Sequence, residues 1–305
     1  MREKSLRPSG STYAKLIKNC FRPPKGWIFC GADYNSLEDY VSALTTKDPN
    51  KIKVYEDGYC GHCLRAYYYF NKEFPDLKET PEDVNKIKNE KVYGNWRQLS
   101  KAPTFALTYQ GTYTTLMNNC GFQMEEAMSI EASYHEMYKV SDQWVQDKLK
   151  QANIDGYVTV AYGLRVRTPL IKNVVWGAPR MPYEAAAEGR TAGNALGQSY
   201  GLVNTAAGIK LQDRTLASEY RLKILPSAHI HDAQYFLIKD EVGAVKWLND
   251  NLIECMSDHG LPELDWHPTV KIGAELDLFY PTWKDDINIK NNLSMTEILK
   301  VVQAL

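Results

Sequence analysis

The chain has 305 residues, of which 44% are hydrophobic and 24% are charged, so it can bury the core of one large domain or two smaller ones. Its formal net charge of −1 excludes the overall positive charge that marks many nucleic-acid-binding proteins, and any DNA site must therefore be a local positive groove. No apolar run has the length of a membrane span and no secretion signal is evident, which predicts a cytoplasmic protein without a membrane partner.

A short buried strand is the first element predicted. Residues 27–32 (WIFCGA) are almost entirely apolar and end immediately before Asp33. Residues 37–44 then carry apolar side chains at helical spacing, so Asp33 is expected at the end of a strand and before a helix. From Asp48 to about Lys91, prolines interrupt a mixture of charged and aromatic residues, a pattern typical of short helices joined by turns.

The middle of the chain is predicted to be mainly helical. Residues 124–150 have apolar positions at 3.6-residue spacing, which indicates one or two long helices. Residues 156–169 alternate and turn like a β-hairpin, and a second helical block follows from Ala185 to about Tyr220.

Two β segments are then predicted to meet at a tight turn within residues 228–238, with Asp232 at its tip. Asp33 lies on a predicted strand and Asp232 on a predicted hairpin, and a helical insertion separates the two. This order allows both aspartates to converge on one sheet. The predicted fold class is therefore α+β.

The cysteines show no repeated spacing, which favours free thiols over a disulfide framework. Cys60 and Cys63 have the CxxC spacing of redox and zinc sites. We find neither a βαβ context nor a second ligand pair around them, so an incidental CxxC is favoured over a redox or zinc site.

The two aspartates suit nucleotidyl transfer, which uses two divalent ions roughly 4 Å apart. Two carboxylates on rigid strands suffice, because Mg²⁺ keeps water ligands and takes others from the substrate phosphates. Taken singly, an Asp at a strand end is more often a turn or cap residue.

A second pattern consists of two cations and two aromatic residues at four-residue intervals: Arg97, Lys101, Phe105 and Tyr109. Steps of four keep them on one slowly rotating face of a helix. Such a face suits a triphosphate with its base further along, and an amphipathic helix with a solvated basic end is the simpler alternative. Pro103 predicts either a kink or a helix that begins near Ser100.

These residues resemble the motifs of the family A DNA polymerases, which include bacterial DNA polymerase I. Residues 33–38 (DYNSLE) resemble motif A, the stripe from Arg97 to Tyr109 resembles motif B, and His231-Asp232 resembles the start of motif C. A further stretch, Arg190-x3-Asn194-x3-Gln198, is similar to the primer–template contact helix of the family. The resemblance runs from about Arg7 to Tyr280 and is closest to bacteriophage members.

The resemblance implies a template-directed DNA polymerase that adds dNTPs to a primer 3′-hydroxyl by a two-metal mechanism. Asp33, Asp232 and the carbonyl of Tyr34 would hold two Mg²⁺ ions, for which Mn²⁺ can substitute, and Lys101 would also protonate the leaving pyrophosphate. Glu38 would be the steric gate that excludes a 2′-hydroxyl. The other dNTP contacts implied are His62, Arg97, Lys101, Phe105 and Tyr109.

The implied contacts to primer–template DNA are Arg190, Asn194, Gln198 and His231. Purine N3 and pyrimidine O2 present acceptors at similar minor-groove positions in every correct pair. Donors aimed there would check the geometry of a pair without reading its sequence, and an exposed polar helix face is the simpler alternative.

The resemblance also implies a right-hand architecture, with residues 1–45 and 181–305 forming the antiparallel palm and residues 46–180 forming helical fingers. A thumb and an exonuclease are not evident in the sequence. We therefore expect this chain to be one part of a split polymerase, with the thumb on a second polypeptide. Whether that polypeptide also carries an exonuclease is left open. A phage-encoded chain would act in the cytoplasm of a bacterial host.

Three positions depart from the family motifs. Ala233 stands where motif C normally has Glu, Tyr40 where motif A usually has Arg, and Gln110 where motif B has Gly. Ala233 predicts weakened metal or primer handling rather than inactivity. A non-catalytic DNA-binding or assembly remnant is the main alternative, and a two-carboxylate hydrolase, which leaves the Arg/Lys stripe unexplained, ranks third.

Overall fold

The computed structural model describes residues 16–303. The start of the predicted palm segment and of the family resemblance, before residue 16, lies outside these residues. The described chain divides into two compact units, residues 16–37, 201–260 and 272–303 in the first and residues 38–200 and 261–271 in the second. Each unit is described by itself, and the assignment of palm and fingers to particular residues stays a prediction.

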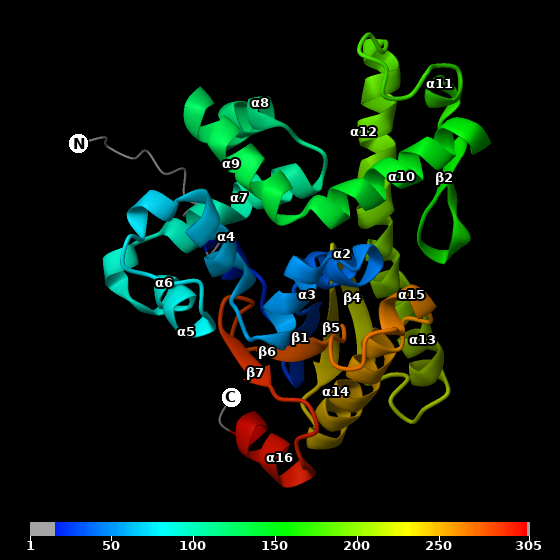
Figure 1. Cartoon of the computed structure of the whole chain (residues 1–305). Coiled ribbons are helices and arrows are strands. Elements are labelled where there is room, and N and C mark those ends of the chain that lie inside the picture. The colour runs from blue at the N-terminus through cyan, green and yellow to red at the C-terminus, as the bar shows by residue number, and fades with distance from the viewer. Residues whose placement is uncertain (1–15, 304–305) are drawn as a thin grey trace. The chain divides into compact units, whose positions relative to one another are not determined.

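An antiparallel sheet of five strands forms the first unit, in the order β4-β5-β1-β6-β7 (Figure 1). The strands are β1 (Trp27–Tyr34), β4 (Ile224–Ile230), β5 (Ala233–Lys239), β6 (Ala274–Phe279) and β7 (Asp286–Ile289). The central strand β1 pairs with β5 on one side and with β6 on the other. It continues two residues beyond the predicted end at Ala32, because pairing with these neighbours keeps Asp33 and Tyr34 extended.

Side chains of β1 alternate between the two faces of this sheet. Cys30 and Tyr34 are buried, and the Tyr34 hydroxyl donates to the carbonyl of Met256 at 3.0 Å. Met256 belongs to α14 (Val242–Ser257), which packs with α13 (Leu202–Leu216) and α16 (Met295–Gln303). Phe29 and Asp33, at alternate positions, project from the opposite face. The helices thus cover one face of the sheet, and Asp33 lies on the other.

The second unit is mainly helical. Its longer helices are α2 (Leu37–Thr46), α3 (Pro49–Glu56), α4 (Gly61–Tyr69), α7 (Trp96–Thr108), α9 (Met124–Met137), α10 (Lys139–Asp155) and α12 (Tyr183–Gln198). Single turns of helix lie at α5 (Pro81–Val84), α6 (Lys86–Asn89), α8 (Tyr113–Thr115), α11 (Pro169–Lys172) and α15 (Pro262–Asp265), with 3-10 or π turns at 71–73, 91–93, 116–120, 161–163 and 199–201.

Several predicted elements of this unit are confirmed. The helical pattern of residues 124–150 forms two helices, which are separated at Tyr138. The predicted hairpin consists of β2 (Tyr157–Thr159) paired with β3 (Arg165–Arg167). Local capping explains some ends, since the carboxylate of Asp48 accepts the amide of Asn50 at the start of α3.

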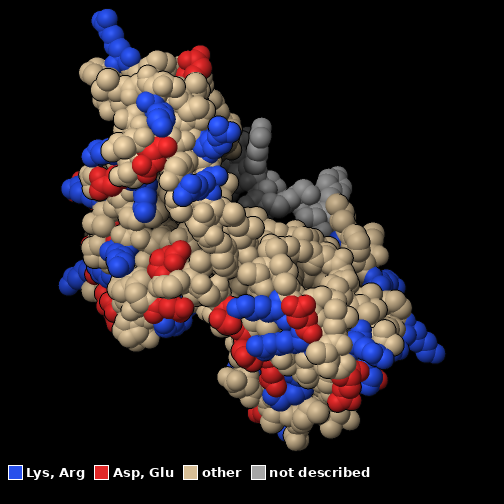
Figure 2. Space-filling model, turned by 90° about the vertical axis from the view of Figure 1, so that its right-hand side faces the viewer, with Lys and Arg blue, Asp and Glu red and all other residues tan. Residues whose placement is uncertain are grey.

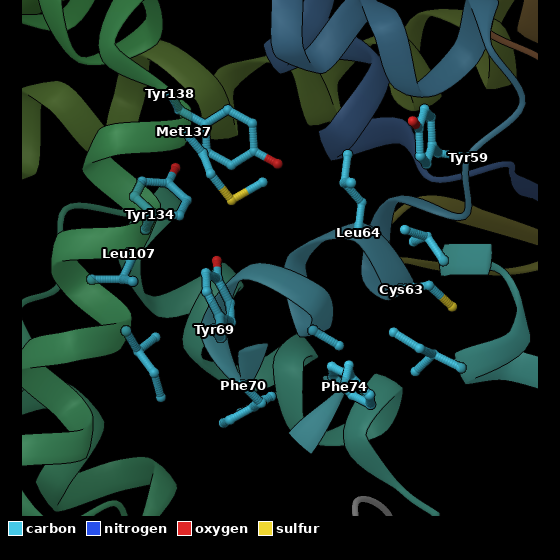
Figure 3. Packing of buried hydrophobic residues seen from close by; sticks show 14 of the residues in the cluster. Tyr59, Cys63, Leu64, Tyr69, Phe70, Phe74, Leu107, Tyr134, Met137 and Tyr138 are labelled. Atoms are coloured by element: carbon cyan, nitrogen blue, oxygen red, sulfur yellow. The ribbon is translucent and has the colours of Figure 1, made fainter. Parts of the chain in front are cut away.

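Aromatic side chains dominate the main core of the second unit. Figure 3 shows Tyr69 of α4 and the following Phe70 with Leu107 of α7 and Tyr134 of α9 in one cluster. Each fully buried side chain of this size contributes about 1.5–3 kcal/mol. The polar atoms are paired, as in the hydrogen bond of 3.0 Å between the hydroxyls of Tyr69 and Thr104. This core fixes α4 against α7.

Charged side chains are spread over the surface. Figure 2 shows Lys and Arg interspersed with Asp and Glu on the face in view, in agreement with a net charge near zero. Within the described residues, none of the helices combines the length and the apolar character needed to cross a membrane.

Candidate active site

Asp33 and Asp232 lie side by side at one end of the sheet. In the antiparallel register Asp33 of β1 is opposite Ala233, the first residue of β5. Residues 231 and 232 form a two-residue turn between β4 and β5, because Ile230 pairs with Ala233. The turn places His231 in the left-handed region, at a φ of 57°. The hairpin tip predicted for Asp232 is confirmed, and it delivers that carboxylate beside Asp33.

The two carboxylates repel one another. Burial of the Asp33 carboxyl, the negative charge of Asp232 and a hydrogen bond shared with Asp232 raise the pKa of Asp33 to about 6. The backbone amide of Tyr34 and the ring of His231 oppose this shift. His231 Nδ1 lies 3.0 Å from Asp232 Oδ1. A cation between the carboxylates would remove their repulsion, so this pair suits a divalent metal ion.

The strand on the other side of β1 supplies a carboxylate that the sequence reasoning missed. Glu275 of β6 is opposite Asp33 in the register, so both side chains project from the same face. Asn288 Nδ2 donates to Glu275 Oε2 and to Asp277 Oδ1, each at 3.0 Å. The alternation of residues 274–279 (AELDLF) is the sequence signal that points to this strand.

A cleft of about 430 Å³ opens on this face of the sheet. Asp33, Asp277 and Asp286 contribute carboxylates to it, and Lys18 and Lys284 contribute cations. Its wall is aromatic: Tyr235 packs against Trp283 with ring centroids 5.1 Å apart. Burial, with a smaller contribution from the charges of Asp286 and Glu275, raises the pKa of Asp277 against the hydrogen bond from Asn288. The site is therefore acidic at the end of the sheet with an apolar wall beside it.

Helices α4 and α7 bring the predicted triphosphate contacts together in the second unit. Because α7 begins at Trp96, Arg97 lies within the helix, and a start near Ser100 is wrong. The helix runs through the buried Pro103. Ser100 Oγ donates to the carbonyl of His62 at 2.8 Å, which joins the two helices. Arg97, Lys101 and His62 thus form one basic region.

Like charges and burial weaken the basicity of this region. Burial and the positive charge of Arg65 lower the pKa of His62 to about 4, so the imidazole is neutral at pH 7. Burial and the neighbouring Arg97 also lower the pKa of Lys101. An anion would compensate the positive charges of Arg97 and Lys101. The lowered pKa also means that the Lys101 ammonium gives up a proton more readily than that of an exposed lysine.

Glu38 and Tyr109 form the predicted sugar-contact region. The Tyr109 hydroxyl donates to Glu38 Oε1 in a very short hydrogen bond. Glu38 lies in the first turn of α2, and Tyr109 follows the last residue of α7. A cavity of about 60 Å³ is lined by both residues and by Asn194 of α12.

The predicted DNA-contact trio lies along α12 with its four-residue spacing. Arg190 and Gln198 are exposed and Asn194 is half-buried. The Arg190 guanidinium stacks over the ring of Tyr183, with 5.7 Å to the centroid. Asn194 Oδ1 is buried without a hydrogen-bond partner among the described residues, so it is available to a ligand or a water molecule.

The predicted residues therefore fall into two sets. The carboxylate pair with Tyr34 and His231 belongs to the first unit, and the stripe, Glu38, His62 and the α12 trio belong to the second. Among the described residues, no group of three or more His, Cys, Asp or Glu side chains is arranged to hold a metal ion. A metal bound by the carboxylate pair would take further ligands from water or substrate.

Comparison with known proteins gives consistent matches. The family model described as DNA polymerase family A matches residues 8–277. The thermostable DNA polymerase I of Thermus thermophilus is 24% identical over 189 residues, which are 61% of this chain and 21% of that protein. The DNA polymerase I of Streptococcus pneumoniae strain R6 is 25% identical over 227 residues, 73% of this chain and 23% of that protein.

A solved structure has the same fold. The POL domain of Pol1 from M. smegmatis, in complex with DNA primer-template and dNTP, matches with a TM-score of 0.69 and 19% identity, over 92% of this chain and 44% of that chain. The likeness confirms the predicted α+β class, with an antiparallel palm sheet and helical fingers. The chain spans only about a fifth of the length of the curated relatives described above.

Proposed function

Because this chain belongs to DNA polymerase family A, we propose that it catalyses template-directed transfer of dNTPs to a primer 3′-hydroxyl. The observation that carries the proposal is the pair of carboxylates, Asp33 and Asp232, which two antiparallel strands bring together. The basic region on α4 and α7 supports a triphosphate as the substrate.

The carboxylate pair fits divalent metal ions. Two facing carboxylates, one of them with a raised pKa, form an oxygen donor set of the kind that Mg²⁺ and Mn²⁺ prefer. Asp33 and Asp232 would hold the ions, with the carbonyl of Tyr34 assisting. When bound, Mg²⁺ supplies the charge that activates the primer hydroxyl and neutralises the phosphates.

The residues on α4 and α7 would bind and orient the triphosphate. Arg97 has a planar guanidinium that can contact two phosphate oxygens, and His62, neutral at pH 7, would donate an N–H rather than a charge. Lys101 would protonate the departing pyrophosphate, and its lowered pKa favours that transfer. Phe105 would stack on the nucleotide.

Glu38 would discriminate against ribonucleotides. Its carboxylate is fixed by the hydrogen bond from Tyr109, which limits the positions that it can adopt. A fixed carboxylate beneath the sugar would crowd and repel a 2′-hydroxyl. The α12 trio, with His231, would contact the primer–template duplex, with the amide nitrogen of Asn194 donating to the minor-groove acceptors of a base pair.

Glu275 would replace the carboxylate that Ala233 lacks. Asp33 lies between Ala233 on β5 and Glu275 on β6, so the two positions flank it on the same face. We assign Glu275 the supporting role toward a metal ion or the primer terminus. The proposal also includes a bacteriophage-type origin and a partner polypeptide that supplies a thumb. It leaves open whether that partner also carries an exonuclease.

Primer extension by the purified chain, alone and mixed with the product of the neighbouring gene as the proposed partner, tests this proposal directly. We expect incorporation with Mg²⁺ or Mn²⁺ that falls at least about a thousandfold, the scale of a lost catalytic group, in Asp33→Asn and in Asp232→Asn. Asp240→Asn, an exposed acid of the same unit, is the matched control. Unchanged extension in the two site variants would remove the polymerase assignment.

A non-catalytic DNA-binding remnant is the second candidate, and Ala233 is the observation that favours it. A remnant would bind primer–template DNA with an affinity that depends on Arg190 but would not extend the primer under any condition. The same extension assay, run beside a DNA-binding titration, separates the two functions.

A further inference from the structure

Cys60 and Cys63 are placed at the N-terminus of a helix. Cys60 is the residue that precedes α4, and Cys63 is the third residue of that helix. The Cys63 amide donates to the Cys60 carbonyl at 2.8 Å, which closes the first turn. The thiols of Cys60 and Cys63 also share a hydrogen bond. The two side chains therefore adjoin, as a disulfide between them requires.

The two thiols differ in their surroundings. Cys63 is fully buried in the core shown in Figure 3, whereas Cys60 is only half-buried. The backbone amide of Cys60 donates to Asn85 Oδ1 at 2.7 Å, which anchors the start of the helix. One thiol is thus open to small reagents, and the other is reached only through the first.

Arg97 contacts Cys60 directly. Its Nε donates to Cys60 Sγ at 3.4 Å. A hydrogen bond from Cys63, and then the bond and charge of Arg97, lower the pKa of Cys60 to about 4 against the effect of burial. The hydrogen bond and burial raise the pKa of Cys63. Helix N-termini and neighbouring cations are the settings in which cysteine thiolates become nucleophilic.

We propose that Cys60 and Cys63 form a redox-active dithiol, which low-molecular-weight disulfides convert into an intramolecular disulfide that releases Arg97. A structural zinc site is disfavoured, because no third His, Cys, Asp or Glu completes a metal site around the pair in the described residues.

The oxidation is an ordinary thiol–disulfide exchange. The Cys60 thiolate attacks one sulfur of oxidised glutathione, forms a mixed disulfide and expels one glutathione thiolate. Cys63 then gives its proton to solvent and attacks Cys60 Sγ, which expels the second glutathione thiolate. Two protein thiols are oxidised to one disulfide, and one glutathione disulfide is reduced to two thiols.

Oxidation would change the charge next to Arg97. In the dithiol form a thiolate partly neutralises the guanidinium, and in the disulfide form that negative charge is gone. Because Arg97 and Lys101 are proposed triphosphate contacts, this consequence rests on the proposed function. We expect the KM for dNTP to fall about threefold or more on oxidation, with a smaller change in kcat.

The chemistry can be tested without any activity. The full chain is equilibrated with reduced and oxidised glutathione, alkylated with N-ethylmaleimide and mapped by peptide mass spectrometry. We expect Cys60 and Cys63 to become protected together as oxidised glutathione increases, and to be released together by dithiothreitol. Continued alkylation of both residues in excess oxidised glutathione would overturn the proposal.

Variants separate the two cysteines. Cys63→Ser should trap Cys60 as a mixed disulfide with glutathione, and Cys63→Ala provides the same test should serine be poorly tolerated in the core. Cys120→Ser, in the same unit, should leave the pair unchanged. Cys60→Ser should have the low KM of the oxidised chain under all conditions.

The two proposals fail separately. A disulfide that forms in a chain that extends no primer, either alone or with the proposed partner polypeptide, supports the redox site and contradicts the polymerase assignment. Primer extension by a chain whose Cys60 and Cys63 never become protected supports the polymerase assignment and contradicts the redox site. A disulfide that forms with an unchanged KM overturns the link to Arg97.

Discussion

Asp33 of β1 and Glu275 of β6 are direct cross-strand neighbours on the open face of the sheet. Ala233, on the other side of Asp33, is the position where the resembling family motif has glutamate. The side chain missing from one flank of the aspartate is therefore present on the other flank. In the proposed supporting role, Glu275 would supply negative charge from the neighbouring strand, on the opposite flank of Asp33 from Ala233.

Glu275→Gln is expected to weaken Mn²⁺ binding about tenfold, because removal of a carboxylate that supports a metal ligand has effects of this size. The measurement is a titration of free Mn²⁺ by electron paramagnetic resonance, which does not depend on turnover. Glu219→Gln, an exposed acid of the same unit, is the control.

The relocation idea also predicts rescue. Ala233→Glu in the Glu275→Gln background should restore most of the Mn²⁺ affinity, because it returns a carboxylate to the other side of Asp33. Unaltered affinity in Glu275→Gln alone would mean that Glu275 contributes nothing to the metal site.

The raised pKa of Asp33 predicts a pH-dependent metal affinity. Burial and the Asp232 charge raise the pKa of Asp33 to about 6, so protons compete with a metal ion below that pH. Mn²⁺ affinity should rise between about pH 5 and pH 7 and then level off. In Asp232→Asn the remaining transition should move to lower pH, because the repelling charge is removed.

The same shift has the opposite consequence for stability without metal. Asp33 binds its proton more tightly in the folded chain than in the unfolded chain, so its contribution is fully present below about pH 4 and is lost as the pH rises through about 6. Asp33→Asn should therefore increase the free energy of unfolding at pH 7 in the presence of a chelator. A smaller gain at pH 4 is the internal control, and equal gains at both pH values would contradict the explanation.

The hydrogen bond between Tyr109 and Glu38 predicts two separable effects on sugar selection. Glu38→Ala should increase the use of ribonucleotides relative to deoxynucleotides by at least about tenfold, which is about 1.4 kcal/mol. Tyr109→Phe keeps the ring and removes the bond, so the freed carboxylate should relax selection less. The ratio of kcat/KM for rNTP to kcat/KM for dNTP measures the effect of each variant. Equal ratios for Glu38→Ala and the unmodified chain would remove the assignment of Glu38 as the gate.

The strand that ends at Asp33 and the turn that carries Asp232 could be predicted from the sequence, because a short apolar strand and a two-residue turn are local patterns; their convergence on one sheet followed from the resemblance to the family motifs. The contact between Arg97 and Cys60 could not, since it depends on how α4 packs against α7. The register that brings Glu275 to Asp33 joins residues far apart in sequence and is fixed by the sheet as a whole. Pro103 was misleading because its position deep in the core keeps α7 intact where an isolated helix would end.

The ion pair between Asp39 and Arg65 predicts a stability effect in the second unit. Arg65 Nη2 lies 2.6 Å from Asp39 Oδ1, and the side chains are 5% and 26% exposed. Burial raises the pKa of Asp39, but the charge of Arg65 and its hydrogen bonds lower it below the ordinary value. Asp39→Asn would leave the buried guanidinium without its counter-charge, at a cost of about 2–3 kcal/mol after allowance for the partial exposure of Asp39.

Urea unfolding, followed by the helical circular dichroism signal, measures this cost. The dependence of the unfolding free energy on urea concentration should have the same slope in the variant and in the unmodified chain, which confirms that the same transition is observed. Asp147→Asn is the matched control, because its pair with Lys150 at 3.5 Å is exposed and should contribute less than about 0.5 kcal/mol. Arg65 also donates to the Tyr138 hydroxyl at 3.0 Å, so Tyr138→Phe in the Asp39→Asn background should destabilise the chain further, by about 1–3 kcal/mol, because it removes a remaining acceptor of the buried guanidinium. Equal stability of Asp39→Asn and Asp147→Asn would show that the guanidinium is compensated by other groups.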